Sequence, residues 1–347
     1  MKSNNLLTIL FFFSLLFTSC MGTIQFRVMK PADIDVPQSI QYLATANRYK
    51  PDKPYRAWNV IEGILSGEGI GMDRRSAEVC LEGLNAVLNE SPRYKYAQLA
   101  IDLPGTGTAN FPEPLQASEV DRLCQMSKAD ALVTIEAFDS DSKADFSTFT
   151  RKVTQNNESR DVTYHRVESN VRVTVGWRMY RAKDGVILDQ YRMNENLVFK
   201  GEGTSRNDAV SKLPSKENMV REVGRRLGNL YASRISPAWF WVSRNYFTQA
   251  PKTPEMKLAR RAVRVNNWEE AARIWKTVLS KNDPKSSSRA MFNLALASEY
   301  SGDLKSATDW SEQAYKNGLQ RALEYNGTLR QRLFDEERLK NQLSKPE

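Results

Sequence analysis

The chain has 347 residues and a formal net charge of +9, with 41% hydrophobic and 26% charged residues. This balance is typical of globular proteins and excludes a collagen-like or largely disordered chain, while the length suits about two domains. One histidine and three cysteines are too few for a His-rich metal site or a four-cysteine zinc site, so we expect neither a metal nor another cofactor.

The first twenty residues have the pattern of a bacterial export signal. Lys2 supplies a positive charge, and residues 6–17 form an apolar run that is too short to span a bilayer. The run ends in LFTSC (residues 16–20), which resembles the lipobox of bacterial lipoproteins, although Phe17 stands where Leu, Val or Ile is usual. The resemblance implies removal of residues 1–19 and acylation of Cys20, with palmitate among the acyl chains. Ordinary cleavage near a free cysteine is the alternative.

The residues after Cys20 bear on the compartment. No acidic residue follows Cys20 closely. By resemblance to sorting in Gram-negative bacteria, this absence implies a lipid anchor in the outer membrane, facing the periplasm. No later stretch approaches the length of a membrane-spanning helix. Cys80 and Cys124 would therefore lie in a compartment that permits a disulfide, and both buried free thiols and a disulfide between them remain open.

Residues 20–250 are expected to form an α/β domain, because short strands and helices follow one another. Apolar spacing predicts strands at residues 25–29, 40–46, 94–101 and 131–138, and helices at residues 73–89, 118–127 and 219–231. Alternating runs at residues 171–179 and 186–199, joined by a turn, predict a long antiparallel hairpin.

Three segments of this region carry a family resemblance. RVMKPADIDVP (residues 27–37), ADALVTIEAFDSD (129–141) and ISPAWFWVSRNYF (235–247) resemble, together with the lipobox, a family of uncharacterised lipoproteins of Bacteroidota. The resemblance covers nearly the whole chain and implies a location and an architecture without an activity. The order of elements is also similar to that of curli-secretion and peptidoglycan-synthase-activator lipoproteins, which is an analogy of fold only.

Three local patterns in this region resemble chemical sites in part. The glycine-rich residues 67–73 are interpreted as a plain loop, because no P-loop lysine follows them. Asp139, Asp141 and Asp145 resemble a calcium loop only faintly and are interpreted as a solvated turn at a strand end. His165 is interpreted as a surface imidazole. We therefore assign no catalytic residue and expect no enzyme.

From residue 251 the pattern changes to alanine-rich helices. Residues 266–275 and 301–307 resemble each other and the central turn of tetratricopeptide repeats, with Ala271 and Ala307 separated by 36 positions against a period of about 34. Residues 251–347 are therefore expected to form an all-α domain similar to tetratricopeptide repeats, with residues 319–343 as a cap or a third pair.

The first helices of such repeats line a concave face, and that face is expected to be basic here. A basic groove favours acidic peptides or a C-terminal carboxylate, although an ordinary solvated helix face is the alternative. Nucleic acid is not expected as a partner because of the compartment. The predicted partner-binding residues are Lys257, Arg260, Arg264, Arg289 and Asn293.

The first functional hypothesis is a non-catalytic envelope lipoprotein that serves as a scaffold for protein–protein interaction. The second is an envelope hydrolase acting on glycan or peptide, with carboxylates such as Glu136 and Asp139 at a strand end. The third is an oligomeric secretion component whose long hairpin joins a barrel. Charged side chains expected on the outer face of that hairpin, Arg172, Arg178 and Arg192, argue against contact with lipid.

Overall fold

The computed structural model describes residues 21–48, 72–101, 103–105, 108–281 and 283–344. The chain forms two compact units. Of the described residues, those within 31–239 and 341–344 form the α/β unit, and those within 21–30 and 240–340 form the helical unit. The units therefore divide the chain differently from the expected boundary at residue 250, because the first and last strands belong mainly to the helical unit.

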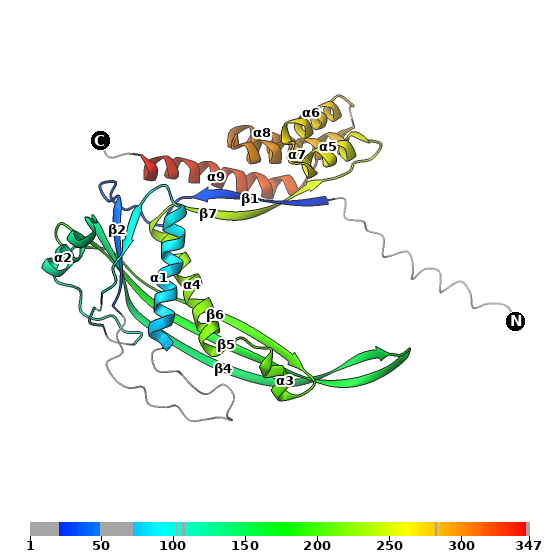
Figure 1. Cartoon of the computed structure of the whole chain (residues 1–347). Coiled ribbons are helices and arrows are strands. Elements are labelled where there is room, and N and C mark those ends of the chain that lie inside the picture. The colour runs from blue at the N-terminus through cyan, green and yellow to red at the C-terminus, as the bar shows by residue number, and fades with distance from the viewer. Residues whose placement is uncertain (1–20, 49–71, 102, 106–107, 282, 345–347) are drawn as a thin grey trace. The chain divides into compact units, whose positions relative to one another are not determined.

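A mixed five-stranded sheet forms the centre of the α/β unit (Figure 1). Its strands, in spatial order, are β3 (Lys95–Gln98), β2 (Tyr42–Asn47), β4 (Ala131–Gln155), β5 (Glu158–Arg181) and β6 (Ile187–Gly203). The first three strands are parallel, and β4, β5 and β6 form an antiparallel meander. The predicted α/β region with a long antiparallel hairpin, followed by helices, is confirmed.

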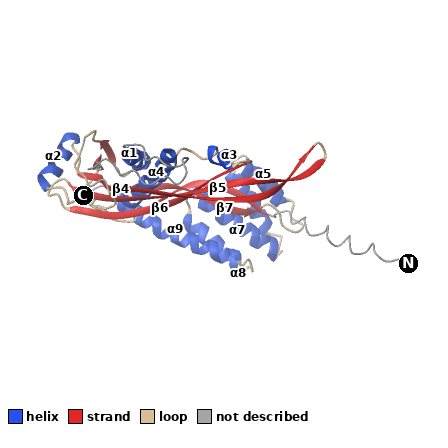
Figure 2. Ribbon diagram, turned by 90° about the horizontal axis from the view of Figure 1, so that it is seen from below, coloured by secondary structure: helices blue, strands red, loops and turns tan. Residues whose placement is uncertain are grey.

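Helices cover both faces of this sheet. One face packs against α1 (Met72–Glu90) and α4 (Lys216–Ile235), which lie alongside the long strands in Figure 2, and the short α3 (Arg206–Ser211) contacts β6. The other face packs against α2 (Ala117–Ser127). α1 connects the parallel strands β2 and β3, and α2 precedes β4, as crossover helices do.

The helices α1 and α4 approach each other closely because glycines lie between them. A Cβ atom added at Gly228 would lie 1.9 Å from the carbonyl oxygen of Cys80, and one added at Gly83 would lie 2.3 Å from that of Arg225. A side chain at either position would force the helices apart, so this close packing requires glycine at both positions.

The strand β4 is much longer than its apolar segment predicts. The expected turn at Asp139, Asp141 and Asp145 is wrong, because these residues continue β4 and pair with β5 at Thr174, Arg172 and Glu168. The chain turns instead at Asn156 and Asn157, whose φ values of 52° and 66° suit a tight hairpin turn. The outer half of the hairpin carries polar side chains on both faces, so the periodicity of apolar residues does not predict it.

The two described cysteines are buried free thiols. Cys80 belongs to the core between the sheet and α1, whereas Cys124 belongs to the core beneath α2 on the opposite face. Of the two alternatives, the structure contains the free thiols. Burial raises the pKa of Cys80 and raises that of Cys124 to about 12, so neither sulfur is a reactive thiolate near neutral pH.

The helical unit contains a two-stranded ribbon and five helices. The ribbon pairs β1 (Met21–Lys30) with β7 (Ala238–Phe247). The helices are α5 (Glu255–Arg264), α6 (Trp268–Leu279), α7 (Pro284–Ser301), α8 (Leu304–Lys316) and α9 (Arg321–Leu343). No helix within the described ranges has the length and apolar composition needed to cross a membrane.

The ribbon packs its apolar side into the core of the helices. Phe26 of β1 contacts Tyr300 edge-on, with ring centroids 5.4 Å apart, and Phe247 of β7 contacts Phe292 in the same way at 5.5 Å. Trp275 is fully buried in this core. Strands far apart in the sequence thus complete the hydrophobic core that the helix pairs share.

Candidate functional site

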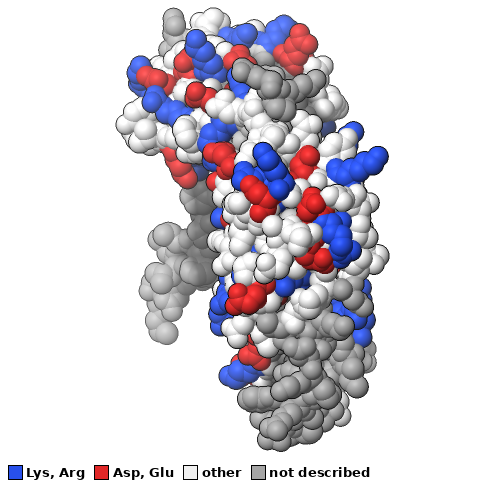
Figure 3. All heavy atoms as spheres, turned by 90° about the vertical axis from the view of Figure 1, so that its left-hand side faces the viewer, with Lys and Arg blue, Asp and Glu red and all other residues white. Residues whose placement is uncertain are grey.

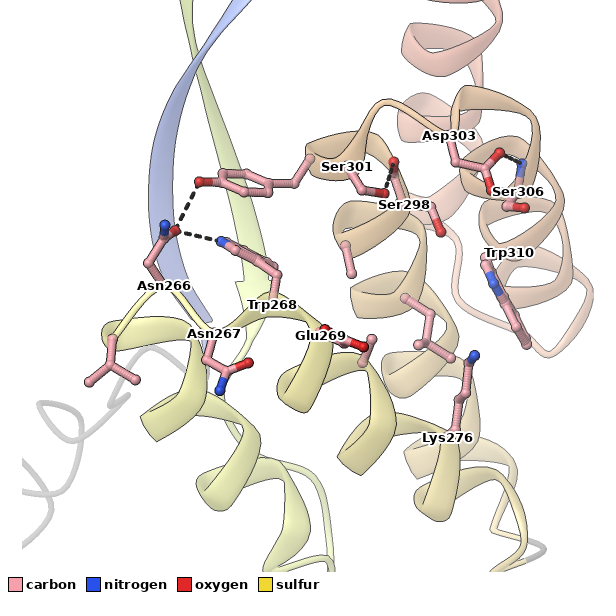
Figure 4. A pocket seen from close by; sticks show the side chains of 15 residues that line it. Asn266, Asn267, Trp268, Glu269, Lys276, Ser298, Ser301, Asp303, Ser306 and Trp310 are labelled. Atoms are coloured by element: carbon pink, nitrogen blue, oxygen red, sulfur yellow. Dashed lines mark hydrogen bonds between the residues drawn. The ribbon is translucent and has the colours of Figure 1, made fainter.

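The helical unit contains an open pocket of about 810 Å³ between the α5–α6 turn, α6, α7 and α8 (Figure 4). Apolar side chains and a mixture of polar and charged groups line it. Its lining includes Trp268, Glu269, Lys276, Leu294, Ala297 and Trp310.

The α5–α6 turn holds one end of the pocket. Asn266 has φ 59°, a left-handed conformation that asparagine tolerates better than most residues. Its side-chain oxygen accepts hydrogen bonds from Trp268 Nε1 and from the Tyr300 hydroxyl, each at 2.9 Å. The Trp268 and Tyr300 rings stack with centroids 4.6 Å apart. This network fixes the Trp268 ring and joins the first helix pair to α7.

Side-chain caps fix the starts of the two helices beside the pocket. The Asn267 side chain accepts from the Glu270 amide at the start of α6, and Asp303 accepts from the Ser306 amide at the start of α8. Hydrogen bonds from the Ser306 side chain and backbone lower the pKa of Asp303. Because these caps fix the residue at which each helix begins, they hold the starts of α6 and α8 in place beside the pocket.

The opposite end of the pocket is formed by α6 and α8. Lys276 projects from α6 toward the half-buried Trp310 of α8, while Glu269 lies nearer the α5–α6 turn (Figure 4). Neither Lys276 nor Glu269 forms an ion pair with another described residue. The pocket therefore offers aromatic and aliphatic surface, and the charged side chains of its lining are Lys276, Glu269 and the helix-capping Asp303.

Two of the five predicted partner-binding residues are engaged with β7. Asn293 is fully buried and bonds both the amide and the carbonyl of Phe247. Arg289 donates to the carbonyl of Gln249 at 3.0 Å, and its guanidinium lies 4.9 Å from the Phe247 ring. The inner side of α7 that was expected to receive a partner is thus covered by a strand of the same chain.

The other three predicted residues lie on α5. Lys257 and Arg264 are exposed and Arg260 is half-buried. None of the three contributes to the pocket lining. Lys257, Arg260 and Arg264 therefore lie together on α5. Arg289 and Asn293, by contrast, bind residues of the same chain.

The carboxylate considered for catalysis lies in a buried ion cluster of the α/β unit. Glu136 sits at an irregularity in the β4–β5 register and is fully buried. Its oxygens accept hydrogen bonds from Arg48 (2.5 Å), Arg178 (3.4 Å), Thr134 (2.5 Å) and Tyr180 (2.9 Å). Every one of these contacts fixes the carboxylate in place.

Arg178, which was expected on the outer face of the hairpin, is instead buried in this cluster. The two arginines also hold a surface segment onto the sheet. Arg178 donates to the carbonyl of Pro112, and Arg48 donates to the carbonyls of Pro104 and Glu113. Asp139, by contrast, is exposed on β4. The buried charges around Glu136 thus stabilise the fold, because they join the loop that contains Pro104, Pro112 and Glu113 to the sheet.

Sequence reasoning missed the pocket residues, although two signals for them exist. The dipeptide Asn266-Asn267 before Trp268 is a turn followed by a helix cap, and Gly302-Asp303 repeats that arrangement before α8. Each signal marks the turn between the two helices of a pair. The lining residues themselves follow only from how the two helix pairs stack.

Two predictions fall on residues that the structure does not describe. The signal segment with Cys20 and the glycine-rich residues 67–71 lie outside the described ranges. Within those ranges, no group of three or more His, Cys, Asp or Glu side chains is arranged to hold a metal ion.

Comparison with known families gives two matches that follow the two parts of the chain. A domain of unknown function, DUF8603, matches residues 40–247, which span the sheet and its helices as far as the end of β7. A second domain of unknown function, DUF6340, matches residues 257–335, from α5 into α9. No curated protein matches the chain.

Proposed function

The chain belongs to the DUF8603 family, and from this premise we propose that it is a non-catalytic, lipid-anchored protein of the cell envelope. In this proposal the acyl chains on Cys20 hold the protein at the outer membrane, facing the periplasm. The helical unit binds a segment of a protein partner. The observation that carries the binding role is the open pocket between the α5–α6 turn, α6, α7 and α8.

The proposed anchor rests on the sequence around Cys20. An apolar run that ends in a small residue and a cysteine suits lipoprotein processing, and more than one acyl chain gives lasting attachment. Met21 begins β1, so the proposed lipid would be attached directly before a strand of the helical unit. The helical unit would then stay close to the membrane surface.

We further propose that α5–α6 and α7–α8 are two repeats of the tetratricopeptide type. Ala271 and Ala307, which occupy corresponding positions of α6 and α8, are both fully buried. Small buried residues at such positions let paired helices approach closely. Stacking of two such pairs leaves the groove that contains the pocket, a surface suited to an extended or helical peptide.

The lining of the pocket indicates the chemistry of the partner. An apolar side chain fits against Leu294 and Ala297 between the Trp268 and Trp310 rings, where aromatic surface binds at a low cost in entropy. An acidic side chain next to it in the partner would reach the free Lys276. We therefore propose a peptide segment with an apolar residue flanked by an acidic residue.

Site-specific photocrosslinking tests the binding role. A photoreactive residue at Trp310 should capture a defined partner in intact cells, whereas the same residue at Phe334, which is 58% exposed on α9, should not. A peptide from the captured partner should then bind the purified chain, and Lys276→Glu should weaken that binding at least fivefold, since about 1 kcal/mol corresponds to fivefold. Equal capture at both positions, or peptide binding unaffected by Lys276→Glu and Trp310→Ala together, would remove the pocket from the proposal.

Acylation tests the anchor independently of the pocket. Labelled palmitate should be incorporated into the native chain and not into Cys20→Ser, and the variant should leave the membrane fraction after cleavage of its signal. Incorporation into Cys20→Ser would place the lipid elsewhere and overturn this part.

A further inference from the structure

The exposed side of α5 carries a row of unpaired positive charges. Lys257, Arg260, Arg261 and Arg264 are one, three, four or seven residues apart and lie along one side of the helix, next to its buried face, which Met256 and Ala259 help to form. No acidic side chain in the described part of the chain forms an ion pair with any of the four. Like charges at this spacing repel each other, so an anionic partner would stabilise the row.

This basic row lies beside the first residues of β1. The Tyr246 ring packs on Gly22, where an added Cβ atom would come within 2.7 Å of ring carbons. Burial raises the pKa of the Tyr246 hydroxyl, and the positive charges of Arg260 and Arg264 partly oppose this rise. Both guanidinium groups therefore lie within electrostatic range of the hydroxyl of Tyr246, whose ring covers Gly22.

A further cation contacts the same end of the strand. Arg321, at the start of α9, contacts the sulfur of Met21. Figure 1 shows the start of β1, α5 and the start of α9 at one end of the helical unit. Gly22 lies at most about 7 Å along the chain from Cys20.

Two exposed aliphatic side chains continue the row on its outer side. Leu258 is 49% exposed and Val265 is 74% exposed. At about 100° of rotation per residue, Leu258 lies next to Arg261 on the helix, whereas Val265 directly follows the last helical residue, Arg264. Cations and exposed aliphatic groups along one side are typical of helices that lie in a membrane interface.

We propose that the basic side of α5, with Arg321, binds the anionic headgroups of the leaflet that holds the acyl chains of Cys20. This inference rests on the proposed anchor, which brings the first residues of β1 to the membrane. It also gives Arg260 and Arg264 a partner other than the acidic peptide expected from the sequence. On the face drawn in Figure 3, the basic and acidic side chains of the described residues are interspersed.

Vesicle binding tests the proposal without using the lipid anchor. The full chain carrying Cys20→Ser is mixed with vesicles of phosphatidylcholine alone and with vesicles that also contain phosphatidylglycerol. The bound fraction is measured by co-sedimentation. The chain should prefer the anionic vesicles, and high salt should abolish the preference. Replacing Arg260, Arg261 and Arg264 together by Gln should lower the preference about 100-fold, since each cation near the surface contributes about fivefold.

A matched variant distinguishes the effect of the basic side of α5 from the effect of total charge. Lys152, Arg160 and Lys183 are exposed basic residues of the α/β unit, and their replacement by Gln removes the same net charge. This control should keep the preference within about twofold of the parent chain. Equal losses in both variants, or an unchanged preference in the α5 variant, would overturn the proposal. Failure of palmitate labelling would overturn only the anchor, because this assay contains no acylated protein.

Discussion

Asn293 of α7 bonds both backbone groups of Phe247 in β7: its Nδ2 donates to the Phe247 carbonyl and its Oδ1 accepts from the Phe247 amide, each at 2.8 Å. A side-chain amide thus replaces a neighbouring strand at this position. The residues are 46 positions apart, and Asn293 is fully buried. This pair fixes the strand that covers the inner side of α7, where the sequence suggested an open groove.

Replacing Asn293 by Ala should release β7 locally. Two hydrogen bonds of about 1 kcal/mol each are lost, and the Phe247 amide and carbonyl stay buried without partners, so we expect a local loss of about 3 kcal/mol. Hydrogen exchange of the Phe247 amide should then accelerate about 100-fold. Asn317→Ala, which alters an exposed amide at the end of α8, is the control and should leave that exchange unchanged. Equal exchange in the two variants would show that another contact holds β7.

The helices of the fold follow from the sequence where apolar spacing is strong. The helix expected at residues 73–89 is α1 at Met72–Glu90, and the one expected at residues 219–231 lies inside α4. Their buried faces repeat every three to four residues, so burial and periodicity carry the same information. The predicted strands at residues 25–29 and 40–46 correspond to β1 and β2 for a similar reason.

The spacing of apolar residues does not predict which distant segments pair. The Thr23 hydroxyl bonds the side-chain oxygen of Asn245, 222 positions away, and no local pattern indicates that β1 pairs with β7. The assignment of β1 to the helical unit and the covered side of α7 both follow from this pairing. Likewise, the pocket arises where two turns meet, so its lining depends on tertiary stacking that residue periodicity does not encode.

Glycines at the α1–α4 contact should be irreplaceable. In Gly228→Ala the new methyl group would meet the Cys80 carbonyl at 1.9 Å, so the helices must separate and we expect a loss of about 2–3 kcal/mol in the free energy of unfolding. Gly327→Ala in α9 is the matched control, because nothing lies within 4 Å of its added Cβ atom. The control should raise stability by up to about 1 kcal/mol through helix propensity. Urea unfolding compares the two, and a Gly228→Ala variant as stable as the parent would contradict the close approach.

The ion cluster of the α/β unit should be sensitive to loss of its anion. Glu136→Ala leaves Arg48 and Arg178 as two buried cations without their carboxylate, and we expect the free energy of unfolding to fall by about 3–5 kcal/mol. Glu222→Ala, at an exposed position of α4, should change it by less than about 0.5 kcal/mol. Thermal unfolding followed by circular dichroism measures both variants. Similar small effects in the two variants would mean that water or rearrangement replaces the carboxylate.

Glu299 predicts a pH dependence of the helical unit. It is buried and accepts hydrogen bonds from Arg244, Tyr325 and Arg332. Burial raises the pKa of this carboxyl, but the hydrogen bonds from Arg244 and Tyr325 outweigh burial and leave the pKa below its ordinary value of 4.5. Because the folded-state pKa is the lower one, the ionised carboxylate contributes stability above about pH 4.5, and this contribution is lost as the pH falls through the folded-state pKa.

Glu299→Gln should therefore destabilise the helical unit at neutral pH, by about 2 kcal/mol from weakened charge-assisted hydrogen bonds. The difference in stability between the parent chain and the variant should shrink as the pH falls below 4.5, since the parent then loses the same charge. Urea unfolding of both chains at neutral and acid pH measures that difference, in which the titration of all other groups cancels. A difference that stays constant across this range would show that Glu299 is held without its charge, and that its three partners act only through packing.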